Sequence, residues 1–187
     1  TWASGWKSPI YCDNRIVLSH PKIRNFLSQT LAEKIKKDFE GLYVIAGVAT
    51  GAIGIGMLVA QKLDLPFIYV RPQPKKYGQK NQIEGQLIKG ERVLVIEDLI
   101  STGKSSLNAV KALKENGAEI LGMMALFTYG FSIAEKAFDK AGVKLQTLCD
   151  YQNLISTALE KGEISELQSE NLKNWRKNPE IWSPKVH

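Results

Sequence analysis

The sequence has little cysteine, little histidine and no long apolar run. Cys12 and Cys149 are its only cysteines, and it has two histidines. A cysteine pair so far apart in the chain predicts neither a zinc site nor a disulfide framework, so we expect a reducing, cytoplasmic setting. The longest apolar stretch, Leu121–Phe127, has the length of a buried strand and falls far short of the ~20 residues of a membrane span. We therefore expect no association with a membrane.

The chain also has no internal repeat and no low-complexity linker. Its 187 residues, 44% hydrophobic and 24% charged, indicate a single domain with a buried core. The formal net charge is +6, which suits a nucleic acid, an anionic membrane or a phosphorylated substrate. The basic residues are scattered rather than gathered with aromatic residues in a stripe, so we expect no nucleic-acid partner. A small polyanionic substrate accounts for the charge equally well.

Short apolar runs alternate with amphipathic stretches from Leu42 onward. We expect strands at Leu42–Ala46, Pro66–Val70, Arg92–Ile96, Ile120–Phe127 and Lys144–Leu148. Helices are expected between them, at Ala52–Leu63, Ser105–Asn116 and Ser132–Ala141. Alternation at this spacing predicts an α/β fold with a doubly wound, mostly parallel five-stranded sheet and flanking helices. Ligands of such sheets bind at the carboxyl ends of the strands.

Three segments lie outside this alternation. Residues 1–20 begin with an extended stretch that is rich in polar and aromatic side chains. Residues 71–86 are polar, contain prolines and glycines, and have no hydrophobic period. A structureless segment of that length inside a compact domain is usually functional or disordered, so we expect a mobile loop there. Residues 151–187 should carry C-terminal helices, two of them within Tyr151–Trp175 and packed on the sheet.

An acidic pair, Glu97 and Asp98, follows the apolar strand and precedes a helix. The helix start offers free backbone N–H groups and the positive end of the helix dipole. Gly103, in the turn between them, lets the backbone approach a ligand closely. The segment adds the hydroxyls of Ser101, Thr102, Ser105 and Ser106. Together these groups predict a cradle for a phosphomonoester.

The two carboxylates restrict which phosphate ligand would fit. Beside an anion cradle they would repel a bare polyphosphate, but they suit a ligand with vicinal hydroxyls, such as a ribose, or one that arrives with Mg²⁺. Two alternatives are weaker. Gly103-Lys104-Ser105 is similar to the end of a P-loop, but Asp98 stands where that motif requires a glycine. A carboxylate could instead cap the next helix, which explains one acidic residue better than two.

The segment Val95–Ser105 resembles the phosphoribosyl pyrophosphate (PRPP) motif of type I phosphoribosyltransferases. The resemblance implies the fold of that family, with a small N-terminal hood over the base and a mobile catalytic loop. It implies that the acidic pair holds the ribose hydroxyls and that the next loop holds the 5-phosphate. Mg²⁺ would be the cofactor, held mainly by PRPP, pyrophosphate and water rather than by protein ligands. The implied PRPP-binding residues are Glu97, Asp98, Leu99, Ile100, Ser101, Thr102, Gly103, Lys104 and Ser105.

Four further segments are similar to orotate phosphoribosyltransferases, in the order of that family and over nearly the whole chain. Ser4–Arg15 resembles their base-covering segment, and Ala46–Gly51 resembles their pyrophosphate loop. Arg71–Gly85 resembles their mobile catalytic loop, and Phe127–Gly130 matches one bacterial branch. The resemblance implies transfer of ribose 5-phosphate from PRPP to orotate, giving orotidine 5′-monophosphate and pyrophosphate in UMP biosynthesis. It also implies a homodimer whose loops reach into the neighbouring subunit's site.

The roles of single residues follow from the same resemblance. The implied catalytic residues are Lys75, Arg71 and Asp98. Loop residues that would contact PRPP, with its pyrophosphate, are Arg71, Lys75, Lys76, Tyr77, Thr50 and Gly51. Residues that would contact orotate are Ser101, Tyr11 and Cys12. Closure of the loop would exclude water from the reaction and bring positive charge to the leaving pyrophosphate.

The chain departs from the family pattern in the loop and near the base. Many relatives have His at the position of Tyr77 and Lys at that of Pro72. Because His titrates near pH ~6.5 and Tyr near ~10, Tyr77 could donate a hydrogen bond to pyrophosphate but no charge. Relatives outside this bacterial branch hold the base with an arginine near Tyr129, which leaves Lys7 and Arg15 as weak candidates for the orotate carboxylate. A purine phosphoribosyltransferase and a PRPP-binding regulator without turnover remain alternative hypotheses.

Overall fold

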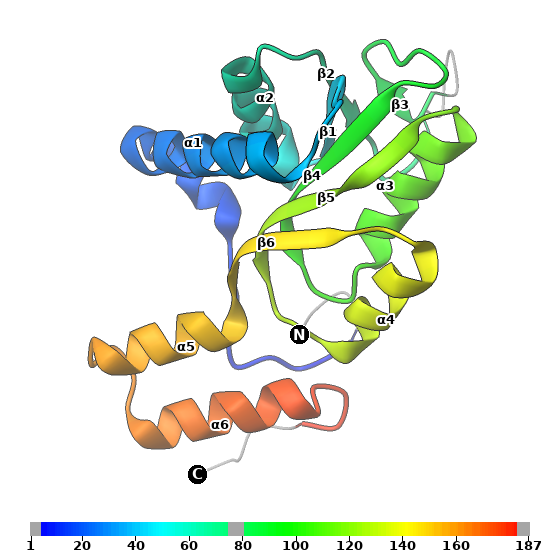
Figure 1. Cartoon of the computed structure of the whole chain (residues 1–187). Coiled ribbons are helices and arrows are strands. Elements are labelled where there is room, and N and C mark those ends of the chain that lie inside the picture. Colours follow the sequence, from blue (N-terminus) through cyan, green and yellow to red (C-terminus); the bar gives the residue numbers. More distant parts are fainter. Residues whose placement is uncertain (1–4, 75–80, 183–187) are drawn as a thin grey trace.

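The computed structural model describes residues 5–74 and 81–182. Strands and helices alternate along most of this length (Figure 1). The strands are β1 (Val44–Val48), β2 (Phe67–Val70), β3 (Ile83–Glu84), β4 (Arg92–Ile100), β5 (Glu119–Thr128) and β6 (Leu145–Asp150). The helices are the 3-10 helix η1 (Asn14–Ser19), α1 (Pro21–Asp38), α2 (Gly51–Leu63), α3 (Lys104–Glu115), α4 (Ser132–Ala141), α5 (Tyr151–Glu160) and α6 (Glu166–Lys177).

The strands form one sheet in the order β3-β2-β1-β4-β5-β6. The pairs β2–β1, β1–β4, β4–β5 and β5–β6 are parallel, and β3 alone runs antiparallel to its neighbour β2. The five predicted parallel strands are confirmed, but the sheet has six strands rather than five. The additional strand, β3, lies within the predicted loop 71–86. With two residues, it is too short to show an alternating hydrophobic pattern. From β1, the strand order runs to β2 and β3 on one side and to β4, β5 and β6 on the other. A crevice is therefore expected where the order reverses, at the carboxyl ends of β1 and β4.

Helices cover both faces of the sheet, as the alternation predicts (Figure 1). On one face, α1 and α2 pack against strand residues that include Ile45, Leu94 and Ile96. On the other, α3 and α4 pack against residues that include Val93 and Val95. Successive β4 side chains therefore enter opposite layers, which is why this strand appears as an uninterrupted apolar run.

Helix α1 is the largest element that the sequence pattern does not predict. It begins with Pro21 at its first turn, and it buries only Ser28, Leu31, Ala32 and Ile35. Most of its residues are polar, so its apolar period is weak and the helix depends on packing against α2. In the described parts of the chain, no helix is both long and apolar enough to span a bilayer.

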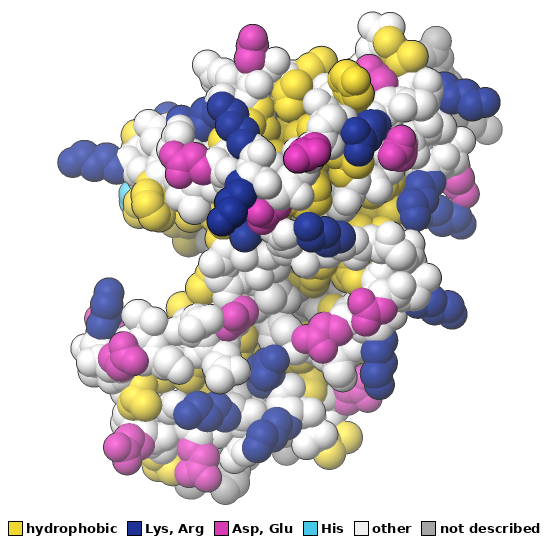
Figure 2. Space-filling view, in the orientation of Figure 1, with side chains coloured by type: hydrophobic (Ala, Val, Ile, Leu, Met, Phe, Trp, Pro, Cys, Tyr) yellow, Lys and Arg dark blue, Asp and Glu magenta, His cyan; other side chains and the backbone are white. Residues whose placement is uncertain are grey.

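The two C-terminal helices are present as predicted, but they do not cover a face of the sheet. They pack beyond its carboxyl edge (Figure 1). A cluster of mainly aromatic side chains lies between them and the sheet edge. The buried members are Phe127, Tyr129, Phe131, Tyr151, Ile155 and Trp175. Against them lie Trp6, Ile10 and Cys12 of the N-terminal segment, which is described over residues 5–20. Figure 2 shows this side of the molecule hollowed between α1 and α5. The N-terminal segment and the last helices thus form one small unit at the edge where a ligand is expected.

Helix α3 offers a test of the core on which the site rests. Leu113 is fully buried in the cluster beneath α3. Replacing Leu113 with Ala should lower the free energy of unfolding by about 2–5 kcal/mol, because apolar contacts are lost and a cavity remains. Lys111→Ala on the exposed side of the same helix is the matched control and should change it by less than about 0.5 kcal/mol. Chemical denaturation measures both, and equal effects would contradict this assignment of the core.

Candidate active site

Three predicted site segments meet at the carboxyl edge of the sheet. They follow β1, β2 and β4, whose carboxyl ends lie side by side because these strands are parallel neighbours. Strand β4 continues through Ile100 rather than ending at Ile96, since Glu97, Leu99 and Ile100 pair with β5. The acidic pair therefore stands on the strand itself and not in the loop after it.

Glu97 is the inner member of the acidic pair. Its side chain is 4% exposed, and both carboxylate oxygens accept hydrogen bonds, one from the Ser106 hydroxyl at 2.8 Å and one from the Asp98 backbone N–H at 3.0 Å. Burial, with the neighbouring Asp98, raises the pKa of Glu97 well above its usual value of 4.5. Ser106 is itself buried, so its hydroxyl faces Glu97 and does not join the predicted phosphate cradle. Contact of Glu97 with a ribose stays a prediction.

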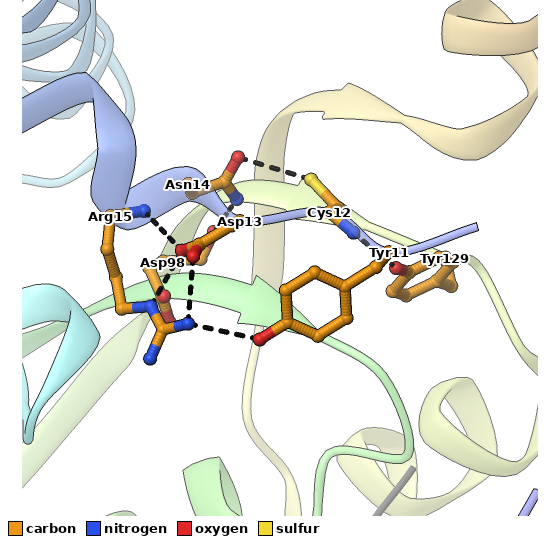
Figure 3. A network of polar contacts seen from close by, with 7 residues as sticks. All are labelled: Tyr11, Cys12, Asp13, Asn14, Arg15, Asp98 and Tyr129. Atoms are coloured by element: carbon orange, nitrogen blue, oxygen red, sulfur yellow. Dashed lines mark hydrogen bonds and ion pairs between the residues drawn. The ribbon is translucent and has the colours of Figure 1, made fainter. Parts of the chain in front are cut away.

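Asp98 is the more accessible member of the pair. Its carboxylate lies against Gly51 at the start of α2, where a side chain would collide with both oxygens. The preceding peptide bond, Ala49–Thr50, is cis. On the other side, the Asn14 amide donates to the Asp98 carbonyl at 2.7 Å (Figure 3). The predicted pyrophosphate loop and the N-terminal segment therefore both contact Asp98.

The turn from β4 to α3 has the geometry of an anion site. Gly103 adopts φ +77, a left-handed conformation that favours glycine, and a Cβ there would lie 2.9 Å from the Phe138 ring. Helix α3 begins at Lys104, with no acidic residue in its first turn. Ser101 and Thr102 are half-buried, while Lys104 and Ser105 are exposed. The N–H groups of this turn can therefore donate hydrogen bonds to a phosphate.

Arg71 extends the site at the end of β2. Its backbone N–H donates to the Gln82 carbonyl at 2.8 Å, and the Gln82 amide donates to the Arg71 carbonyl at 2.9 Å. Its guanidinium lies 3.3 Å from the Glu84 carboxylate. Arg71 lines a small hollow with Ala49 and Ser105, so it faces both predicted phosphate-binding segments. The other predicted loop residues, Lys75, Lys76 and Tyr77, lie outside the described residues.

The predicted base-covering segment makes polar contacts both within itself and with distant parts of the chain (Figure 3). The Cys12 N–H donates to the Tyr129 hydroxyl at 3.2 Å, and burial raises the pKa of the Cys12 thiol. Tyr11 is 70% exposed, and its hydroxyl accepts from Arg15 at 3.0 Å. Arg15 donates to both carboxylate oxygens of Asp13, at 2.7 and 3.0 Å. Because Asp13 already neutralises Arg15, this arginine is a poor candidate for the orotate carboxylate.

The structure reveals an arginine that sequence reasoning missed. Arg176 of α6 donates to the carbonyls of Tyr129 and Gly130, at 2.9 and 2.8 Å. The sequence has no arginine close to Tyr129, and no local pattern indicates that α6 folds back onto this turn. Asn14, which binds the Asp98 backbone, was missed for the same reason. Residues that are neighbours in space but this distant along the chain leave no periodic pattern in the sequence.

Comparison with known proteins identifies the family. The profile described as phosphoribosyl transferase domain matches residues 16–155. A protein named orotate phosphoribosyltransferase from Porphyromonas gingivalis is 55% identical over 182 residues, covering 97% of this chain and 87% of that protein. The chain belongs to the orotate phosphoribosyltransferases. A second relative of that name, from Listeria innocua, is 53% identical over 182 residues, covering 97% of this chain and 87% of that protein.

Solved structures share the fold. The orotate phosphoribosyltransferase from Aeropyrum pernix superposes with a TM-score of 0.77 at 28% identity, covering 88% of this chain and 90% of that chain. The UMP synthase of Leishmania donovani gives 0.81 at 26% identity, covering 95% of this chain and 38% of that longer chain. The type I phosphoribosyltransferase fold predicted from the sequence is therefore confirmed, with one further strand.

The buried state of Glu97 makes a prediction about stability and pH. Because its folded pKa is raised above 4.5, the folded protein keeps a proton that the unfolded chain releases. The stability contributed by protonated Glu97 is therefore lost as pH rises from 4.5 toward the raised pKa. Glu97→Gln cannot ionise and should escape this loss. Its free energy of unfolding, relative to the wild type, should increase with pH across that window.

Denaturant unfolding at a series of pH values measures this difference. The matched control is Glu163→Gln, which alters an exposed carboxylate after α5. The curve of unfolding free energy against pH should run parallel for the control and the wild type. A Glu97→Gln curve that also runs parallel would show that Glu97 is ionised alike in the folded and unfolded chains.

Proposed function

We propose that this protein transfers the ribose 5-phosphate group of PRPP to orotate, giving orotidine 5′-monophosphate and pyrophosphate. The observation that carries the proposal is the position of Asp98: its carboxylate lies against Gly51, its carbonyl accepts from Asn14, and its strand leads through Gly103 into α3. The names of relatives that match along 97% of the chain support orotate as the base and UMP synthesis as the pathway.

In this proposal the site works by position and electrostatics. Asp98, with Glu97 behind it, accepts hydrogen bonds from the ribose hydroxyls, and the N–H groups of residues 101–105 hold the 5-phosphate. Negative charge grows on the leaving pyrophosphate as the bond to the ribose breaks. Arg71 and the N–H groups of the Thr50–Gly51 loop would stabilise that charge, together with Lys75 of the predicted catalytic loop.

The carboxylate oxygens at this edge suit Mg²⁺ bound together with PRPP. Mg²⁺ prefers oxygen ligands and commonly uses one or two carboxylates, substrate phosphates and water. Asp98 supplies an accessible carboxylate, and the described residues contain no cluster of three or more metal-ligating side chains. In the proposed reaction, the ion would neutralise charge on pyrophosphate, while the chain's own residues orient the substrate.

The base would lie between the N-terminal segment and the turn after β4. Tyr11 and Cys12 approach from one side, and Ser101 is proposed to donate to orotate from the other. Mixed Lys, Arg, Asp and Glu side chains over the visible face suit small anionic substrates better than a nucleic-acid surface (Figure 2). The free thiols of Cys12 and Cys149 support the proposed reducing, cytoplasmic setting.

Incubation of the protein with PRPP, Mg²⁺ and orotate tests the function directly. Orotate's ultraviolet absorbance should fall as product forms, and pyrophosphate should appear in equal amount. Adenine and guanine, supplied in place of orotate, should give no product. A preference for a purine would contradict the proposed base, and PRPP binding without turnover of any base would indicate a regulator instead.

A mixing experiment tests the proposed homodimer with shared sites. Lys75→Ala and Asp98→Asn should each be nearly inactive alone, because each removes a charge from the reaction centre. If the loop of one subunit completes its partner's site, each heterodimer contains one site with neither change. Random mixing should then restore about a quarter of wild-type activity, from half of the dimers with one intact site each.

The mixed sample needs two differently tagged subunits, so that heterodimers can be isolated and counted. Asp139→Asn, an exposed acidic residue on α4, is the control and should retain full activity alone. If verified heterodimers of the two inactive variants recover no activity, each loop serves the site of its own subunit.

A further inference from the structure

Helix α6 presents two adjacent side chains to the proposed base site. Trp175 is fully buried, and its indole N–H donates to the Lys7 carbonyl in the N-terminal segment at 2.9 Å. Arg176, next in sequence, donates to the Tyr129 and Gly130 carbonyls. One turn of the C-terminal helix therefore binds both the base-covering segment and the turn after β5.

The Arg176 contact is a fork across two consecutive carbonyls. Nε donates to Tyr129 at 2.9 Å, and Nη2 donates to Gly130 at 2.8 Å. Gly130 adopts φ +63, and a Cβ there would lie 2.7 Å from Nη2, so glycine leaves room for the guanidinium. A rigid planar fork fixes both carbonyls at once, whereas a lysine ammonium is a single nitrogen on a flexible stem and holds them less rigidly.

Tyr129 transmits this constraint to the base-covering segment. Its ring is 2% exposed, stacks on Phe131 at a centroid distance of 5.6 Å and meets Trp175 edge-on at 5.7 Å. Its hydroxyl accepts from the Cys12 N–H at 3.2 Å (Figure 3). With its backbone held by Arg176 and its ring held by the aromatic cluster, Tyr129 has little freedom to move, and Cys12 is placed accordingly.

We propose that Arg176 is a positioning residue for orotate: through Tyr129 it sets the place of Cys12, against which the base lies. This inference rests on the proposed function, because it assumes that Cys12 borders the orotate site. The hydrogen bonds of Arg176 go to the turn after β5, whereas Asp98, Gly51 and the predicted phosphate cradle belong to β4, α2 and the start of α3. Loss of Arg176 should therefore weaken orotate binding selectively.

Steady-state kinetics of Arg176→Lys and Arg176→Gln test the proposal. The orotate KM should rise roughly tenfold in Arg176→Gln, as expected for loss of charge-assisted hydrogen bonds. The PRPP KM should stay within about twofold of the wild type, because its contacts are untouched. Arg176→Lys keeps the charge and can reach one carbonyl, so its orotate KM should fall between the two. Lys177→Ala, exposed on the same helix, should leave both constants unchanged.

A double-mutant cycle separates positioning from a general structural effect. Tyr129→Phe removes only the hydroxyl that binds Cys12, so it should raise the orotate KM without raising the PRPP KM. If Arg176 acts through that hydroxyl, the double variant should be little worse than the poorer single variant. Tyr129→Phe also keeps the test valid if the Arg176 variants fail to fold.

Two results would overturn the inference. Equal rises in the KM for orotate and PRPP would indicate a loss of overall structure, and additive effects in the cycle would show that Arg176 does not act through Tyr129. The wild type distinguishes this failure from failure of the proposed function. If the wild type converts orotate and the variants show no selective effect, only the role of Arg176 is wrong. If the wild type does not convert orotate, the proposed function itself fails.

Discussion

The hydrogen bond from the Ser106 hydroxyl to the buried Glu97 carboxylate ties the end of β4 to the first turn of α3. A carboxylate 4% exposed needs such a partner, because a buried oxygen without one carries a large desolvation cost. The bond fixes the direction in which α3 leaves the sheet. It thereby sets the separation between Asp98, on the strand, and the N–H groups that begin the helix. Those are the two groups that, in the proposed reaction, bind one ribose 5-phosphate together.

The frame of this site could be predicted from the sequence because its signals are local. Strands buried on both faces appear as apolar runs, and the acidic pair, the glycine and the hydroxyls follow one such run directly. What the sequence could not supply depends on tertiary contacts. Two-residue β3 shows no period, and α1 is too polar to show one clearly. Ser106 has the same residue type as its exposed neighbour Ser105, and only the helix geometry turns it toward Glu97.

The base side of the site was the least predictable part for the same reason. Its parts come from three distant stretches of the chain: the N-terminal segment, the turn after β5 and helix α6. They are joined by hydrogen bonds such as Trp175 to Lys7 and Arg176 to Tyr129. The sequence indicates a base-covering segment and has no arginine close to Tyr129 along the chain. The fold brings Arg176 to Tyr129 from α6. Its guanidinium binds backbone carbonyls, which suits a role in holding the site's shape.

In the proposed function, Asp98 and the start of α3 together bind a single ribose 5-phosphate group. Calorimetric titration of ribose 5-phosphate, with Mg²⁺ present, measures this without the base or the catalytic loop. The wild type and the remote control Asp139→Asn should bind alike, and Asp98→Asn should bind roughly tenfold more weakly, since hydrogen bonds to a charged group are lost. Equal affinity in all three proteins would contradict the account.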